Sequence, residues 1–227
     1  MKRHNVFYLV HKGLRVMLYD AAVSLQQTDF SNRAEAAGAL AKINDVLYTF
    51  DNHARHEDSF IIPAVAIYEP ETAESFEKEH VEDHRLANRL KNLLVIYDNA
   101  FFAEERSVCG SAIVRAFTEF LVFNLNHMAK EEEVLNQALW EHYTDEQIIA
   151  KHQQLLASIA PDEMQAVVKW MMRGISNADM IEWLKNVKQT SPEFVYNNLL
   201  DIAAAEISEL RFAFIQDALE EEVIAQV

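Results

Sequence analysis

Three pairs of residues with metal-binding side chains interrupt apolar runs of this chain, and the two members of each pair lie four positions apart. The pairs are His53 with Glu57, His80 with His84, and His127 with Glu131. Residues four apart on an α-helix differ by only ~40° in direction, so each pair projects from one helix face. Burying an unpaired carboxylate or imidazole is costly. The pairs therefore favour a fold in which several helices turn these faces toward one shared site.

The remainder of the chain is typical of long helices with few turns. Only four glycines and four prolines occur in 227 residues, and no alternating segments bounded by turn residues indicate strands. Long helices are predicted over about 4–27, 31–68, 71–97 and 104–142, with Ser31 as a cap of the second helix and Pro63 bending or shortening its last turns. Shorter helices are predicted to begin at Thr144 and Pro161 and near residue 180, and a final one runs from about Glu193 to the end.

Four long helices joined by short loops are the pattern of an antiparallel up-and-down bundle. The fold is therefore predicted to be all-α, with a four-helix bundle over residues 1–144. Residues 145–227 are predicted to form a C-terminal helical extension. Because no low-complexity linker separates the two parts, we expect the extension to pack on the bundle.

Charge and composition exclude several classes of partner. The net charge of −16 argues against binding to nucleic acid or to an anionic membrane. No apolar stretch approaches the roughly 20 residues of a membrane span, and the N-terminus has no signal-peptide pattern. A single cysteine, Cys109, excludes an internal disulfide and suits a reducing compartment. A cytoplasmic location is expected.

A lone histidine, His11, lies in the first predicted helix and completes one set of candidate ligands per long helix. Five histidines and two carboxylates are too many for a tetrahedral zinc site and suit two first-row transition-metal ions such as iron. Alone, His11 reads as a core histidine and each pair reads as a solvated helix face. One set on each of four helices favours a metal site.

The remaining histidines are predicted to lie outside the site. His56 is offset by ~60° from His53, so it is exposed or beside the ligands. His4, His142 and His152 have no acid at a productive spacing and are predicted to be structural or surface groups.

The order H…HxxxE…HxxxH…HxxxE on four helices resembles the hemerythrin-like, HHE-type cation-binding domain. The residues that carry this resemblance are HKGLR, HARHEDSFIIPAV, EHVEDH and HMAKEEEVL, and they span roughly residues 4–142. The extension, with PDEMQAVVKWMMRGIS followed by MIEWLKNV, is similar to the tail of some bacterial members.

The resemblance implies a non-haem centre of two iron ions with an oxo or hydroxo bridge. It implies that one iron is held by His80, His84 and His127 and the other by His11 and His53. Glu57 and an acid of the fourth helix would bridge the two ions. Such a 3 + 2 arrangement leaves one iron with an open position for O2, peroxide or NO.

Two acids of the fourth helix are candidates for the second bridge. Oxygen-carrying hemerythrins have an acid five residues after the histidine, which here is Glu132, whereas many other HHE proteins have it four residues after, which is Glu131. Helix geometry favours Glu131, because a residue at i+5 lies ~140° around the helix from His127.

Three functions fit this site. One is a binding protein that captures O2 reversibly or senses O2, NO or iron. A second is an enzyme that reduces peroxide or NO, oxidises iron, or delivers iron for the repair of iron–sulfur clusters. The third is an interaction module in which the metal only joins the helices. No catalytic residue or protein partner can be named, and whether the chain is an enzyme stays open. Polar neighbours such as Asp58 and Lys130 are expected at the edge of the metal face, where they or their waters can relay protons. They therefore predict reaction with O2 or peroxide rather than long storage of O2.

Overall fold

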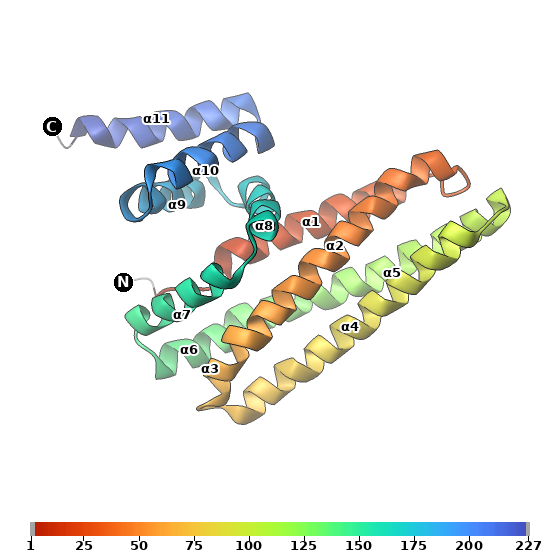
Figure 1. Cartoon of the computed structure of the whole chain (residues 1–227), viewed down its shortest axis with the longest axis horizontal. Coiled ribbons are helices and arrows are strands. Elements are labelled where there is room, and N and C mark those ends of the chain that lie inside the picture. The colour runs from red at the N-terminus through yellow and green to blue at the C-terminus, as the bar shows by residue number, and fades with distance from the viewer. Residues whose placement is uncertain (1–2, 226–227) are drawn as a thin grey trace. The chain divides into compact units, whose positions relative to one another are not determined.

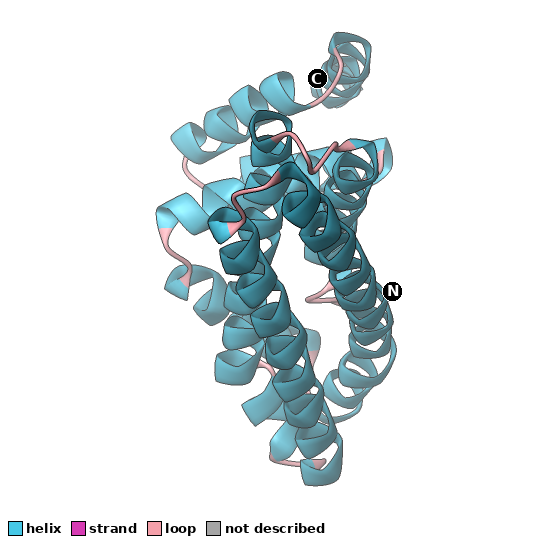
Figure 2. Ribbon diagram, turned by 90° about the vertical axis from the view of Figure 1, so that its right-hand side faces the viewer, coloured by secondary structure: helices cyan, strands magenta, loops and turns pink. Residues whose placement is uncertain are grey.

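The computed structural model describes residues 3–225, and the side chains of residues 3–220. Within this range the secondary structure is helical, the helices are joined by short loops, and no strand is present (Figure 2). The prediction of an all-α fold is confirmed.

The bundle is built from long helices that follow one another along the chain. They are α1 (Tyr8–Gln27), α2 (Arg33–Phe60), α4 (Pro70–Asn99) and α5 (Ala103–Lys130), which continues through η1 (Glu131–Leu135) into α6 (Asn136–His142). Helices α4 and α5 run side by side as an antiparallel pair (Figure 1). The short helix α3 (Ile62–Ala66) joins α2 to α4 and contacts α4 and α6.

Local sequence explains where the second long helix begins and ends. Asn32, rather than the predicted Ser31, caps α2, and its side chain accepts hydrogen bonds from the backbone of Ala34 and Glu35. Pro63 lies in the first turn of α3. Because proline has no N–H to continue the ladder of α2, the chain ends α2 at Phe60 and restarts. The predicted helix over 31–68 is therefore two helices.

The last long helix changes its winding at the predicted site. Residues Glu131–Leu135 form a single π-helical turn, η1, between α5 and α6. A π-turn accommodates one extra residue, so the buried face shifts around the axis beyond this point. Such turns occur frequently at functional sites.

The described residues fall into two compact units. The first contains residues 3–8 and 17–159, and the second contains residues 9–16 and 160–225. Helix α7 (Asp145–Ser158), which begins at the predicted Thr144–Gln147 capping box, contacts α2 in the first unit. The division therefore lies one helix later than the predicted boundary between residues 144 and 145.

Large apolar side chains fill the first unit. Ile43 of α2, Leu90 of α4, and Ile113 and Phe120 of α5 have no exposed surface. A second cluster lies where α3 meets α6 and includes Ile62 and Leu135. The site described below lies among the same helices.

The second unit combines one stretch of α1 with four helices. They are α8 (Pro161–Gly174), α9 (Asn177–Thr190), α10 (Glu193–Glu206) and α11 (Glu209–Ala225). Its core contains Met172, Met180, Leu184 and Ile215, with Leu9 packed against it. The final helix predicted from Glu193 is interrupted between α10 and α11, and its predicted end at residue 227 lies outside the described residues.

One stretch among the described residues, Ala103–His142, is long and apolar enough to cross a membrane by length and composition alone. The prediction that no stretch approaches this length was wrong. The stretch is α5 with its continuation, which contributes buried residues to the core of the bundle, and core helices of soluble proteins meet the same criterion.

Candidate metal centre

Buried ionisable residues gather at one level of the first unit. Helix α2 contributes Glu57, which is 2% exposed, and α4 contributes His80, which is 3% exposed. The junction of α5 and η1 contributes His127 and Glu131, which are 5% and 0% exposed. Ionisable groups are almost never this deeply buried unless they are paired or bind a metal. The four residues therefore mark a polar site inside an apolar bundle.

These four side chains offer ligand atoms that lie within 4.8 Å of one another. His127 Nε2 lies 2.9 Å from Glu131 Oε1. His80 Nε2 lies 3.5 Å from Glu57 Oε2 and 3.8 Å from Glu131 Oε1. The Nε2 atoms of both rings thus point at the two carboxylates, as ligands around one ion would.

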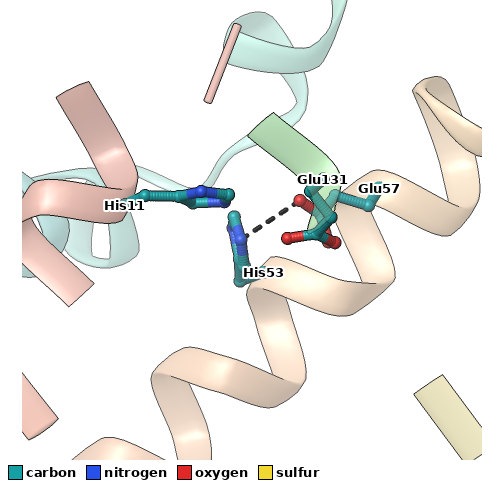
Figure 3. A group of neighbouring side chains, drawn as sticks. All are labelled: His11, His53, Glu57 and Glu131. Carbon is teal, nitrogen blue, oxygen red and sulfur yellow. Dashed lines mark ion pairs between the residues drawn. The ribbon is translucent and has the colours of Figure 1, made fainter. Parts of the chain in front are cut away.

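A second candidate group contains both carboxylates again. Within the first unit its members are His53, Glu57 and Glu131. Figure 3 draws these side chains, and its dashed line marks the ion pair between His53 Nε2 and Glu57 Oε1, which are 3.1 Å apart. His11 is fully buried. It belongs to residues 9–16 of the second unit, so its role as a ligand stays a prediction.

Glu57 and Glu131 are the residues that the two groups share. A carboxylate has two oxygens and accepts contacts at each of them, so one carboxylate can touch two ions. Each group adds its own histidines to this shared pair. The arrangement therefore suits two neighbouring ions with two carboxylates between them.

Two ring nitrogens show that these residues fit a metal. His80 Nε2 and His127 Nε2 are buried and form no hydrogen bond of regular geometry, although each faces a carboxylate oxygen. Buried polar atoms nearly always have one, and an exception requires an explanation such as a bound ion. Imidazole nitrogen combined with carboxylate oxygen is a ligand set that suits first-row transition metals. The residues present therefore fit a centre of this kind.

Two acids outside the ligand groups orient the same histidines. Asp58 Oδ1 lies 2.6 Å from His80 Nδ1, and Glu79 Oε2 lies 2.8 Å from His127 Nδ1. Lys130 Nζ donates a hydrogen bond to the other oxygen of Glu79 at 2.6 Å. A carboxylate on Nδ1 fixes the ring so that Nε2 faces a metal, and it makes the imidazole a stronger ligand.

The roles of these two acids were not predicted. Asp58 was expected only at the edge of the metal face, and Glu79 was not singled out. The available signal was adjacency, since Asp58 follows Glu57 and Glu79 precedes His80. A neighbouring residue points ~100° away from the ligand on its own helix. Each acid therefore contacts a histidine of the next helix instead of its own. Such a contact depends on how the helices pack together and cannot be read from spacing in the sequence.

The buried glutamates raise the pKa values of both histidines. Burial lowers the pKa of His80, but Glu131 and Glu57 outweigh it and raise that pKa to about 11. For His127, burial is likewise outweighed, by Glu131 and Glu79, and the pKa rises to about 9. In the metal-free protein both rings are therefore protonated at neutral pH. The stabilisation from these raised pKa values is complete below the ordinary histidine pKa and is lost as pH rises through about 9 and about 11.

We expect metal binding to release protons and to strengthen as pH rises. A metal binds the neutral ring, so at pH 7 a proton must leave both His80 and His127, whose pKa values are about 11 and about 9. Each released proton makes the apparent affinity rise about tenfold per pH unit, so two protons give a roughly 100-fold rise from pH 6 to pH 7. Anaerobic calorimetric titration with Fe²⁺, in buffers with different heats of ionisation, counts the protons. An affinity that does not change between pH 6 and pH 8 would contradict this expectation.

His84 is a predicted ligand that the structure does not bring to the others. Its side chain is 45% exposed, its Nδ1 lies 3.5 Å from Asp51 Oδ1, and it is in neither ligand group. The buried residue at this turn of α4 is Asp83, three positions after His80. Asp83 lies ~60° to one side of His80 and His84 ~40° to the other, so with His80 and Asp83 both buried His84 turns toward solvent. The structure does not support the predicted set of three histidines around one iron.

A buried amide–acid pair lies one turn from the ligands on α4 and α5. Asn124 Nδ2 donates hydrogen bonds to Asp83 Oδ1 at 2.7 Å and to the carbonyl oxygen of Phe120 at 3.1 Å. Burial raises the pKa of Asp83, although the bond from Asn124 opposes this. The pair connects α4 and α5 beside His80.

The structure distinguishes the two candidate bridging acids. Glu131 is fully buried and belongs to both ligand groups, whereas Glu132 is only partly buried and belongs to neither. The helix is still α-helical from His127 to Lys130, so the i+4 residue shares the face of His127. This geometry favours Glu131, as the spacing predicted.

The remaining histidines lie outside both groups that share the glutamates. His56 Nδ1 lies 3.4 Å from the hydroxyl of Ser158. His4 Nε2 and His152 Nδ1 are 3.0 Å apart, and burial, with a smaller effect of His4, lowers the pKa of His152 to about 4. His142 is exposed and lies in a separate group with two acids.

Comparison with known proteins adds one finding. A family model described as "Hemerythrin HHE cation binding domain" matches residues 4–139. The matched range contains all the residues of the two ligand groups. No curated protein and no solved structure matches the chain.

Proposed function

This chain belongs to the hemerythrin HHE cation-binding family, and we propose on that premise that it holds two iron ions bridged by Glu57 and Glu131. We further propose that the centre reacts with O2 or peroxide instead of carrying O2 reversibly. An oxo or hydroxo group between the ions is part of this proposal.

One observation carries the proposal of two bridged ions. The two ligand groups have different histidines but share both carboxylates. A single ion would need one group, and two independent ions would not use the same acids. The shared pair is therefore what a carboxylate-bridged centre requires. Iron is the proposed metal because the ligands mix imidazole with carboxylate and the family binds cations.

The number of histidines supports a reactive centre. With His84 turned to solvent, each group has two histidines and the two shared glutamates, including His11 as predicted. With fewer histidines than the 3 + 2 arrangement, these residues would leave more room at the metal for O2, peroxide or NO. A di-iron centre of this kind supplies electrons and a binding position for O2, peroxide or NO.

Partly exposed side chains link the buried histidines to solvent, which supports a reaction with O2 or peroxide instead of reversible transport of O2. Asp58 holds His80 Nδ1, and the Asp58 side chain is 43% exposed. Glu79 holds His127 Nδ1 and is itself held by Lys130, whose side chain is 57% exposed. These carboxylates connect the buried rings to water and can hold or pass a proton at Nδ1. A carrier of O2 requires a site from which water and protons are excluded.

Rapid oxidation is the expected result when the iron-loaded protein meets O2 or peroxide. Stopped-flow mixing of the diferrous protein with oxygenated buffer, and separately with peroxide, is expected to give a diferric spectrum within seconds. Asp58→Asn, which keeps the volume but removes the charge on His80, is expected to lower the rate or the iron affinity roughly 10- to 100-fold. Asp51→Asn, next to the exposed His84, is the matched control and should leave both unchanged.

Two outcomes would contradict this proposal. An oxygenated complex that persists for hours and releases O2 when the pressure falls would show a carrier. A protein that binds two irons and reacts with none of O2, peroxide and NO would show that the metal only joins helices.

A further inference from the structure

The second unit contains part of the first helix. It combines residues 160–225 with residues 9–16 of α1, while residues 17–27 of the same helix belong to the first unit. The predicted ligand His11 lies in that short stretch. The C-terminal helices therefore pack with the helical turns that carry His11.

An ion pair joins this stretch of α1 to the start of α9. Lys12 Nζ lies 2.6 Å from Asp179 Oδ2, with side chains that are 25% and 12% exposed. The same Asp179 oxygen accepts hydrogen bonds from the backbone and hydroxyl of Ser176, which begins α9. Burial raises the pKa of Asp179, but Lys12 and Ser176 outweigh it and lower that pKa to about 2. Asp179 thus fixes the residue next to His11 to the first turn of α9.

Glycines bring the backbones of α1 and α8 into contact. A Cβ atom on Gly13 would lie 2.8 Å from Met171 N, and one on Gly174 would lie 2.4 Å from the carbonyl oxygen of Lys12. Both distances are too short for any side chain, and the obstructing atoms belong to the backbone, which cannot turn away. Leu9, one turn before Gly13, packs against the core of the second unit. The His11 segment is therefore held on both sides of His11.

We propose that helices α8 and α9 position His11, so that iron binding and the ordering of residues 160–225 are coupled. This inference rests on the proposed function, because it takes His11 as an iron ligand. Lys12, Gly13, Gly174 and Asp179 are positioning residues, since they act on the metal only through His11. The physical reason is that the first turns of a helix fray unless tertiary contacts hold them, and a ligand that must stay in place needs such contacts.

Replacing Gly13 with alanine tests the contact with α8. Alanine favours a helix over glycine, so helix propensity alone predicts a more stable protein, and any loss of iron reports the obstruction by Met171. Gly38→Ala in α2 is the matched control, because a Cβ there meets no atom within 4 Å. Anaerobic titration with Fe²⁺ is expected to give two irons per chain for wild type and Gly38→Ala, and about one for Gly13→Ala.

Replacing Asp179 with asparagine tests the ion pair without an added atom. Asparagine still accepts the hydrogen bonds from Ser176 but loses the charge that holds Lys12. The control is Asp20→Asn, which removes a similar ion pair farther along α1, between Asp20 and Lys42 at 2.7 Å. Weaker binding of one iron in Asp179→Asn, and unchanged binding in Asp20→Asn, is the expected result. This variant also provides the test if Gly13→Ala does not fold.

Hydrogen exchange measures the coupling in the other direction. A ligand that binds only the ordered state stabilises whatever that state includes. Amides of residues 160–220 are therefore expected to exchange at least several-fold more slowly when Fe²⁺ is added to the wild-type protein, and this slowing should be lost in His11→Ala.

The outcomes separate the two proposals. A wild-type protein that binds no iron would contradict the proposed function itself. A wild-type protein that binds two irons, with unchanged binding in Gly13→Ala and Asp179→Asn and no change in exchange over residues 160–220, would overturn only the inference about α8 and α9.

Discussion

Replacing Glu131 with glutamine is expected to remove both iron ions, whereas the same change at Glu132 should leave two. Glu131 is fully buried and belongs to both ligand groups, so each ion loses a ligand at once. Loss of groups that only support a ligand lowers metal affinity roughly 10- to 100-fold. Loss of a shared ligand should therefore lower it by more than about 100-fold.

Glutamine preserves the size of the side chain, so the packing around η1 should change little. The measurement is iron per chain after anaerobic loading, with circular dichroism to check that the fold persists. Glu132→Gln controls for the loss of one negative charge at the neighbouring position. Two irons in Glu131→Gln and fewer in Glu132→Gln would reverse the assignment. Glu132, instead of Glu131, would then be the residue that faces the metal.

The second large effect separates His80 from His84. His80→Ala is expected to lose at least one iron per chain, because the ring is 3% exposed and its Nε2 faces both glutamates. His84→Ala is expected to retain two irons, because the His84 side chain is 45% exposed and lies beside Asp51. The HxxxH pattern alone predicts that both variants lose iron.

The measurement is the same iron titration, followed by spectra of the oxidised protein. His127→Ala serves as a positive control. Like the His80 ring, the His127 ring has a carboxylate at Nδ1, from Glu79, and faces Glu131 with Nε2. Loss of iron in His84→Ala would restore the predicted set of three histidines. Two irons retained in all three variants would exclude this ligand set altogether.

Much of the fold followed from local signals in the sequence. Capping at Thr144 and the proline that begins α8 were read from single residues and are present in the structure. Pro63 was read as a residue that bends or shortens one helix, and in the structure it lies at the start of a separate helix, α3. These signals act within one turn of helix, so no tertiary information is needed. The interruption between α10 and α11 was missed. Ser208, whose oxygens accept hydrogen bonds from Arg211 N and Phe212 N, was the available signal there.

The division of the chain into two compact units could not be predicted from local sequence signals. A boundary between residues 144 and 145 was predicted because the first four helices are long and the later ones short. In the structure α7 belongs to the first unit, and residues 9–16 of α1 belong to the second. Such membership depends on which helices touch one another. A continuous helix gives no sign in its own sequence that its first turns pack with one set of helices and the remainder with another.

The sequence by itself determined which helix each candidate ligand occupies and which ligands share a face. Spacing sufficed for Glu57 beside His53 and for Glu131 beside His127, because four residues make slightly more than one turn. Tertiary structure alone decided how far α4 rotates, which buries Asp83 and turns His84 to solvent. It also decided that Asp58 and Glu79 support histidines of neighbouring helices. The physical reason is that periodicity defines directions within one helix, whereas rotation and contact between helices depend on how all their side chains pack together.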